Sequence, residues 1–306
     1  MVQVVPLRYD TAFKKAFSQP AIFCQFVHDV LGVDIQIEKV QQGYRYLKPV
    51  GQVDIEYDLF AEDEDARIVV EIQHVKERDF FDRPDGSGSR FARDFLYYHL
   101  VSLVEQVKSS RNYHFDKTVY TVVVLTGSSL DIGIDCSVLM GDISFVNEFW
   151  RKVAVYPHQL VFLVPRLVNE ETPQGIKTWL ELIADSLDDE IDETQYPSPV
   201  FQQVIEAIEL DNLSPEELRK IKDEAVWEDA LREDFEKGRQ EGLREGRQEG
   251  LREGHQEGLQ EGRHQEKEQI ARSMLKAGLD TDLITRITGL DRGIIDQLKP
   301  VLSPNT

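Results

Sequence analysis

Cysteine is scarce in this chain of 306 residues, which contains only Cys24 and Cys136. Two cysteines are too few for a disulfide framework or a zinc cluster, and we expect both to be inert thiols. Long apolar runs are lacking as well. The longest, around 122–125 and 160–164, have the length of strands, and the N-terminus has no charged region followed by an apolar run. We therefore predict a cytoplasmic protein without a signal peptide or a membrane span.

Basic residues are also in short supply, since 35 Lys and Arg stand against 56 Asp and Glu, a net charge of −21. Such a balance argues against extensive phosphate binding. The acidity is concentrated in residues 127–236, which hold 25 acidic and 8 basic residues, whereas residues 1–126 hold 19 and 15. The first part can therefore present a local basic groove to DNA. The candidates for this groove are Arg78, Arg83, Arg90, Arg93 and Lys108.

Two neighbouring stretches, 53–60 and 68–73, alternate apolar and polar residues, and an acidic turn lies between them. This alternation predicts an antiparallel hairpin. Because side chains alternate between the faces of a strand, Asp54, Glu56 and Asp58 share one face, and Glu71 and Gln73 share a face of the second strand. Acidic groups are therefore expected to meet on one side of the hairpin.

Carboxylates that meet on a rigid element are what a small, hard cation such as Mg²⁺ requires. From this pattern Asp54 and Glu71 are candidate metal ligands, with the Ile72 carbonyl and Asp58 as further candidates. The alternative is a solvated outer face of a hairpin, because two acids and a glutamine occur at this spacing by chance.

The rest of the first half has the pattern of a mixed α/β core, with 41% apolar residues to fill it. The periodicity predicts helices at 10–31, divided by Pro20, and at 91–108, and strands at 35–46, 118–126 and 158–165. Asp10 is either the N-cap of the first helix or part of the rim of the metal site. We expect Lys14 and Lys15 to face solvent.

The second half turns helical and acidic after Pro173, and Ser214 to Glu217 has the pattern of a capping box. Glycine then recurs every four residues from Gly238 to Gly262. A glycine in every turn costs about 1 kcal/mol each relative to alanine, so an isolated helix is disfavoured. Three interpretations remain open: a helix that self-associates along its glycine stripe, a flexible polar linker, or a nucleic-acid contact.

The final segment, 268–298, has the spacing of three short helices with Gly278 and Gly289 at the turns. This pattern predicts a small helix-turn-helix unit. Its last helix offers only Arg292, Gln297 and Lys299 to base edges. A helical cap that does not contact DNA is therefore the alternative.

Several stretches together resemble a known family. They are Y-D-T-A-F-K-K-A-F at 9–17, V-D-I at 53–55 with E-I-Q at 71–73, R-D-F-L-Y-Y at 93–98 with Gln106 and Tyr113 after it, and the E-G-x-x repeat leading to I-T-G-L at 287–290. In this order they resemble the Rpn-type recombination-promoting nuclease and transposase family of the PD-(D/E)XK superfamily.

The resemblance implies a restriction-endonuclease-like mixed sheet flanked by helices, followed by an all-helical C-terminal region. It implies a DNA endonuclease that depends on Mg²⁺ or Mn²⁺, with Asp54 and Glu71 as ligands. Gln73 lies where the superfamily usually has lysine, and an amide can only form hydrogen bonds. We expect Arg93 to supply the missing cation, with an ion pair to an acid on the sheet as its alternative role.

We divide the chain into a nuclease-like domain at 1–170, an acidic helical region at 171–236, the repeat at 237–267 and the helical tail at 268–306. The predicted partners are DNA and further copies of the chain. The rival hypothesis is a catalytically inactive module that keeps the fold, binds DNA or protein, and oligomerises through the repeat.

Overall fold

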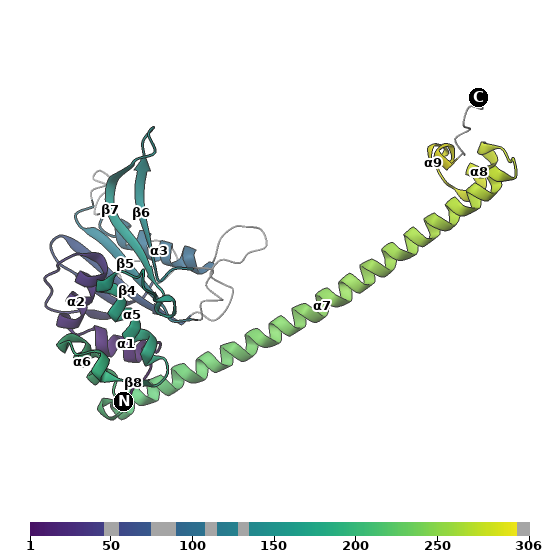
Figure 1. Ribbon diagram of the computed structural model, residues 1–306. Helices are drawn as coiled ribbons and strands as arrows, with labels where there is room; N and C mark the ends of the chain where they lie inside the picture. The colour runs from purple at the N-terminus through teal and green to yellow at the C-terminus, as the bar shows by residue number, and fades with distance from the viewer. Residues whose placement is uncertain (46–54, 75–89, 108–114, 128–134, 299–306) are drawn as a thin grey trace. The chain divides into compact units, whose positions relative to one another are not determined.

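The structure is a computed structural model that describes residues 1–45, 55–74, 90–107, 115–127 and 135–298 (Figure 1). Its internal contacts divide the chain into two compact units, 1–230 and 231–306. Our four-part division of the chain stays a prediction. Within the described ranges, no helix combines the length and apolar character that crossing a membrane requires.

The first unit is built on a six-stranded mixed sheet with the order β2-β3-β4-β5-β7-β6. The strands are β2 (Gln41–Tyr44), β3 (Tyr57–Glu62), β4 (Ala66–Gln73), β5 (Thr118–Leu125), β6 (Val138–Val146) and β7 (Lys152–Leu163). β4, β5 and β7 are parallel to one another, and the remaining pairs are antiparallel. The predicted mixed α/β fold is confirmed.

Helices cover both faces of this sheet. The large core on one face joins the sheet to α1 (Asp10–Phe17), α2 (Pro20–Leu31), α5 (Gln174–Ser186) and α6 (Pro199–Ile208). On the other face, Phe95 and Val101 of α3 (Arg90–Val104) pack in two smaller clusters. Since side chains alternate along β5, Val122 and Val124 enter the first core, whereas Val123 and Leu125 meet α3.

Short elements complete the first unit. They are the strand pair β1 (Val2–Gln3) and β8 (Glu190–Ile191), and the 3₁₀ turns η1 (Pro165–Leu167), η2 (Glu193–Gln195) and η3 (Leu210–Asn212). The long helix α7 (Pro215–Lys276) begins here. The predicted capping box is confirmed, because Glu217 N donates to Ser214 Oγ at 3.3 Å and Ser214 N donates to Glu217 Oε2 at 2.7 Å.

The bounds of several predicted elements differ from the structure. The strand expected at 53–60 is β3, which begins at Tyr57, and the helix expected at 91–108 is α3, which ends at Val104. The strand expected at 35–46 is confined to β2, because an irregular segment precedes it. The hairpin of β6 and β7 extends well beyond the strand expected at 158–165. By contrast, Pro20 does begin a second helix, and the central position of β5 is confirmed.

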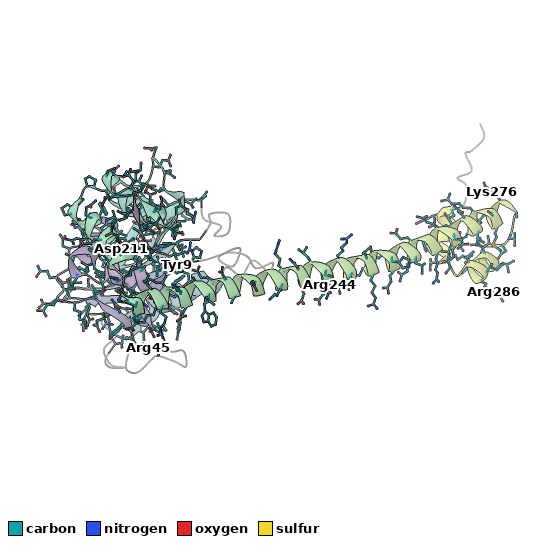
Figure 2. All side chains as sticks on the ribbon, turned by 90° about the horizontal axis from the view of Figure 1, so that it is seen from below. Tyr9, Arg45, Asp211, Arg244, Lys276 and Arg286 are labelled. Carbon is teal, nitrogen blue, oxygen red and sulfur yellow. The ribbon has the colours of Figure 1, made fainter. Side chains whose placement is uncertain are left out.

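The second unit contains most of α7, then α8 (Thr281–Thr288) and α9 (Arg292–Leu298). The glycine repeat is helical, and in Figure 2 the side chain of Arg244 projects from it. The three closing helices enclose a small core of Ala271, Ile284, Leu290 and Ile295. Gly278 and Gly289 have φ values of 78° and 67°, a backbone conformation that favours glycine. The predicted three-helix tail is confirmed.

Trp179 lies at the centre of the larger core. It is fully buried, contacts the rings of Phe17, Phe26 and Phe201, and donates its indole N–H to Asp29 Oδ2 at 2.7 Å. We predict that Trp179→Ala lowers the free energy of unfolding by about 3–5 kcal/mol, because it leaves a cavity and an unpaired acceptor. Urea unfolding followed by circular dichroism measures this loss.

The matched control is Trp227→Ala. Trp227 is 69% exposed on α7, so its replacement should change the free energy of unfolding by less than about 0.5 kcal/mol. Equal losses in the two variants would contradict the central position of Trp179.

Candidate active site

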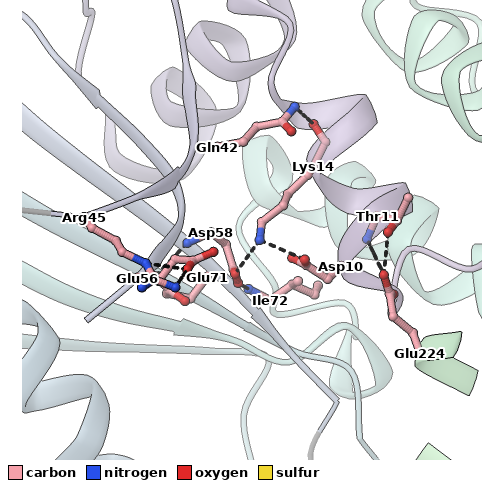
Figure 3. A network of polar contacts seen from close by, with 10 residues as sticks. All are labelled: Asp10, Thr11, Lys14, Gln42, Arg45, Glu56, Asp58, Glu71, Ile72 and Glu224. Carbon is pink, nitrogen blue, oxygen red and sulfur yellow. Dashed lines mark hydrogen bonds and ion pairs between the residues drawn. The ribbon is translucent and has the colours of Figure 1, made fainter. Parts of the chain in front are cut away.

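The hairpin of β3 and β4 brings two carboxylates together. Leu59 pairs with Val70 across the hairpin, so Asp58 and Glu71 are the next residues along the two strands. Asp58 N donates to Glu71 Oε1 at 3.2 Å, and Ile72 N donates to Asp58 Oδ2 at 3.0 Å. The expected meeting of acids on this hairpin therefore occurs, with Asp58 beside Glu71 (Figure 3).

Helix α1 adds a third carboxylate and an amine to this pair. Lys14 Nζ lies 3.1 Å from Asp58 Oδ1 and 2.8 Å from Asp10 Oδ2 (Figure 3). Asp10 and Lys14 are four residues apart, so both side chains lie on the helix face that points to β3. Asp10, Lys14, Asp58 and Glu71 are called the carboxylate cluster below.

The electrostatics of the cluster favour the uptake of positive charge. Burial, the charge of Asp58 and hydrogen bonding to its side chain hold the pKa of Glu71 well above its ordinary value. Burial and Asp58 likewise raise the pKa of Asp10 to about 6, although Lys14 opposes the shift. Burial alone would lower the pKa of Lys14, but Asp58 and Asp10 raise it. Three acids thus share one ammonium group.

The first turns of α7 hold α1 in place. Thr11 N donates to Glu224 Oε1 at 3.2 Å, and the Thr11 hydroxyl donates to the same oxygen. Lys15 Nζ lies 3.2 Å from Glu217 Oε2, and Arg8 Nε lies 3.7 Å from Glu228 Oε2. Because the side chain of the N-cap residue Tyr9 does not cap the helix, Glu224 provides the acceptor that a capping side chain would normally supply.

Two expectations about α1 are wrong. Asp10 is the first residue of the helix and pairs with Lys14, so it is not the N-cap. Lys14 does not face solvent, since its side chain is only 15% exposed inside the cluster. The Asp–Lys spacing of four residues was the signal that sequence reasoning missed, because it can place both groups on a buried face as well as on a solvated one.

The other predicted site residues are placed less fully. Asp54 lies outside the described residues. Arg45 and Glu56 are described residues on either side of 46–54. Arg45 Nε donates to Glu56 Oε2 at 2.6 Å, and this pair lies close to Asp58 (Figure 3). Gln73 is the last residue of β4, and its side chain lies on the same face as that of Glu71. The backbone carbonyl of Gln73 accepts from Thr126 N at 3.0 Å. The backbone of Arg93 lies in α3, and its side chain is outside the described part.

The side chains of the carboxylate cluster are paired with one another and do not form a complete set of metal ligands among the described residues. Among the described residues, no three His, Cys, Asp or Glu side chains converge as a metal ligand set. Two observations still fit a cation here. The carboxyl groups of Asp58 and Glu71 meet, and Asp10 Oδ1 is buried without a hydrogen-bond partner from the described residues. Carboxylate oxygens are the ligands that Mg²⁺ and Mn²⁺ prefer.

Comparison with known protein families was decisive for the first unit. The profile of a PD-(D/E)XK nuclease family transposase matches residues 7–229. The chain belongs to this family. The matched range contains the whole carboxylate cluster and ends where the internal contacts divide the chain. Family membership confirms the predicted resemblance and supports a nuclease-like function.

A second profile describes the C-terminal HTH domain of the Rpn/YhgA-like nuclease family, and it matches residues 264–300. This range covers the end of α7 together with α8 and α9. The helix-turn-helix interpretation of the tail is confirmed. No curated protein and no solved structure matched the chain.

The raised pKa values predict how stability depends on pH. An acid whose pKa is raised by folding keeps its proton in the folded state after the unfolded chain has lost it, so stability falls as pH rises. For Asp10 this fall runs from its ordinary pKa near 4 to about 6, and Glu71, whose pKa is also raised, adds to the fall above its own ordinary pKa. We predict that Glu71→Gln makes the metal-free protein lose less stability between pH 5 and pH 8 than the wild type does.

Urea unfolding in EDTA at both pH values measures this difference. Glu206→Gln is the control, because Glu206 is exposed on α6 and its replacement should leave the wild-type pH dependence unchanged. The same pH dependence in all three proteins would mean that Glu71 is ionised as easily as a surface glutamate.

Proposed function

We propose that this protein is a metal-dependent DNA endonuclease, and that Asp58 and Glu71 hold the metal ion. The observation that carries the proposal is the meeting of these two carboxylates at the end of the β3–β4 hairpin, in a domain of the PD-(D/E)XK nuclease family. Asp54 stays a candidate ligand, and the assay below tests it beside Asp58.

The charges of the carboxylate cluster suit a divalent cation. With all groups ionised, the cluster carries three negative charges and one positive charge, so a divalent ion would neutralise it. When bound, a Mg²⁺ or Mn²⁺ ion would polarise a phosphodiester and lower the pKa of a coordinated water.

The side chains of the chain itself have separate roles in the proposed reaction. Gln73 carries no positive charge to place beside the phosphate. Lys14, held between Asp10 and Asp58, provides that fixed charge instead. Burial and Asp58 raise the pKa of Asp10 to about 6, and no described residue forms a hydrogen bond with its Oδ1, so Asp10 can hold or release a proton near neutral pH. Arg93 stays an alternative source of the cation.

A plasmid-nicking assay with Mg²⁺ tests the proposal. We predict that Asp58→Asn and Glu71→Gln each reduce cleavage by roughly 100-fold or more, because each removes a ligand charge while preserving shape. Lys14→Ala should reduce cleavage more than Arg93→Ala. Asp34→Asn is the matched control, because Asp34 is exposed and pairs with His28 away from the cluster.

Thermal unfolding with Mn²⁺ provides a readout that does not require activity. A ligand that binds only the folded state raises the melting temperature, and this rise should vanish in Asp58→Asn. A rise without cleavage would favour the inactive binding module. Equal nicking by all variants would indicate contamination, and loss of both effects in Asp54→Asn alone would move the site to Asp54.

DNA is the proposed partner of both units. The C-terminal unit contains the helix-turn-helix domain of a nuclease family, and such domains place a helix in the major groove. Arg286 lies in the last turn of α8, and Arg292 begins α9, where it pairs with Asp282 at 2.8 Å. We infer that the acidic first unit is brought to DNA by this domain.

The helical repeat is the proposed element of self-association. A Cβ atom added to any glycine from Gly238 to Gly262 would meet nothing within 4 Å, so the stripe is open to a neighbouring helix. Leu243, Leu251 and Leu259 are exposed on the same helix at a spacing of eight residues. Glycine at every fourth position lets two helices approach closely along their i±4 ridges.

A triple variant, in which alanine replaces Gly246, Gly250 and Gly254, separates the effect of glycine on helix stability from its effect on packing between helices. We predict that the triple variant has a more stable helix, by about 1 kcal/mol for each alanine, but a smaller oligomer because the methyl groups prevent close approach. Circular dichroism and light scattering measure the two effects. An unchanged mass would make the repeat a tether.

A further inference from the structure

The β6–β7 hairpin extends away from the rest of the first unit and exposes large apolar side chains (Figure 1). We call residues 138–156 the arm. Trp150 at its turn is 89% exposed, and Phe145 in β6 is 54% exposed. Met140, Val146 and Phe149 are exposed as well. Large apolar side chains exposed together on one hairpin are unusual on a folded domain and indicate a protein-binding site.

The turn that holds the aromatic side chains is well connected. The Asn147 side-chain carbonyl accepts from the backbone N–H groups of Phe149 and Arg151, each at 3.0 Å, and Trp150 N donates to Asn147 O at 3.0 Å. Trp150 has a φ of 58°, which is uncommon for a residue with a side chain. Phe149 and Trp150 are therefore presented in a fixed arrangement.

The outer edge of the arm is open to pairing. β6 is the last strand of the sheet, and β7 occupies one of its edges. Among the described residues, no strand pairs with the other edge. β6 has none of the lysines or prolines that usually protect an edge strand, and Asp142 is its one charged residue. Its free backbone groups can therefore accept another strand.

The charges of the arm favour a second copy of this chain as the partner. The arm has two acidic residues, Asp142 and Glu148, and two basic residues, Arg151 and Lys152, whereas residues 127–236 as a whole carry −17. Acidic copies repel one another, and the neutral arm is where they can approach most closely. Asp142 is paired with Lys152, whose Nζ lies 3.4 Å away, so a basic group accompanies each Asp142. A nucleic acid would require net positive charge.

The sequence of β6 is also complementary to itself. Antiparallel pairing about a two-fold axis at Asp142 places Leu139 opposite Phe145 of the copy, and Val138 opposite Val146. Apolar side chains then face each other at both ends, Met140 lies opposite Ser144, and the two Asp142 residues meet in the middle. We propose that two copies of this chain pair antiparallel through β6, with the two-fold axis at Asp142. This interface is separate from the helical repeat and does not depend on the proposed nuclease activity.

Disulfide cross-linking in the full chain tests the register directly. Cys24 and Cys136 are first replaced by serine. In this background Asp142→Cys puts two thiols directly opposite each other, with Cα atoms about 4.5–5.5 Å apart, within the range that a disulfide spans. Glu148→Cys is the control, because its two copies would lie roughly 40 Å apart in the same pairing.

We expect Asp142→Cys to give at least ten times more covalent dimer than Glu148→Cys under mild oxidation. No covalent dimer, or equal amounts from both variants, would overturn the proposal. The yield reports on the contact between the two β6 strands even when the repeat associates.

Complementary charges provide the second test. Phe145→Lys and Leu139→Glu, each added to the Asp142→Cys chain, should reduce the yield at least tenfold when tested alone. Mixing the two chains should restore it, because the new charges face each other. Leu210→Lys, at an exposed apolar position outside the arm, should leave the yield unchanged. Unchanged yields with weaker DNA binding would assign the arm to nucleic acid and overturn the proposal.

Discussion

The contact between the Asp58 and Glu71 carboxyl groups is the interaction on which the account of this protein depends. Burial and the neighbouring charge of Asp58 hold the pKa of Glu71 well above its ordinary value, and Glu71 is almost fully buried. Natural folds keep such a pair where it has a use, because burying unpaired charge lowers stability. The raised pKa of Glu71 and the proposed affinity of the site for a cation therefore have the same cause, which is the burial of Glu71 next to Asp58.

The architecture of the first unit serves to hold α1 against this hairpin. The aromatic core around Phe17, Phe26 and Trp179 fixes one side of the helix, and the first turns of α7 fix its N-terminus through Glu224. Lys14 can then neutralise Asp58 only because α1 is held in this position. The family match ends at residue 229, shortly after these contacts, which is consistent with the start of α7 being part of the nuclease domain.

The sequence was sufficient for features that local pattern controls. Alternation predicted the β3–β4 hairpin and the burial of β5, Pro20 predicted the break between α1 and α2, and Ser214 with Glu217 predicted the start of α7. The carboxylate cluster was predicted only in part. Alternation put Asp54 and Asp58 on the same face of the strand and could not say which of them lies next to Glu71. The register of the hairpin places Asp58 there. The role of Lys14 depends on a tertiary contact that helical periodicity does not specify.

The arm was missed for a related reason. Its two strands are apolar on both faces, so they lack the alternation that identifies a half-buried strand. The fold is thus predictable where a segment has one buried face, and it is harder to predict where apolar residues occupy both faces.

The location of a bound ion tests the central claim most directly. Anomalous diffraction from a crystal soaked in Mn²⁺ should show one peak within about 2.0–2.3 Å of a carboxylate oxygen of Asp58 and of one of Glu71. A peak on other acids, or no peak near this pair at a saturating concentration of Mn²⁺, would contradict the account.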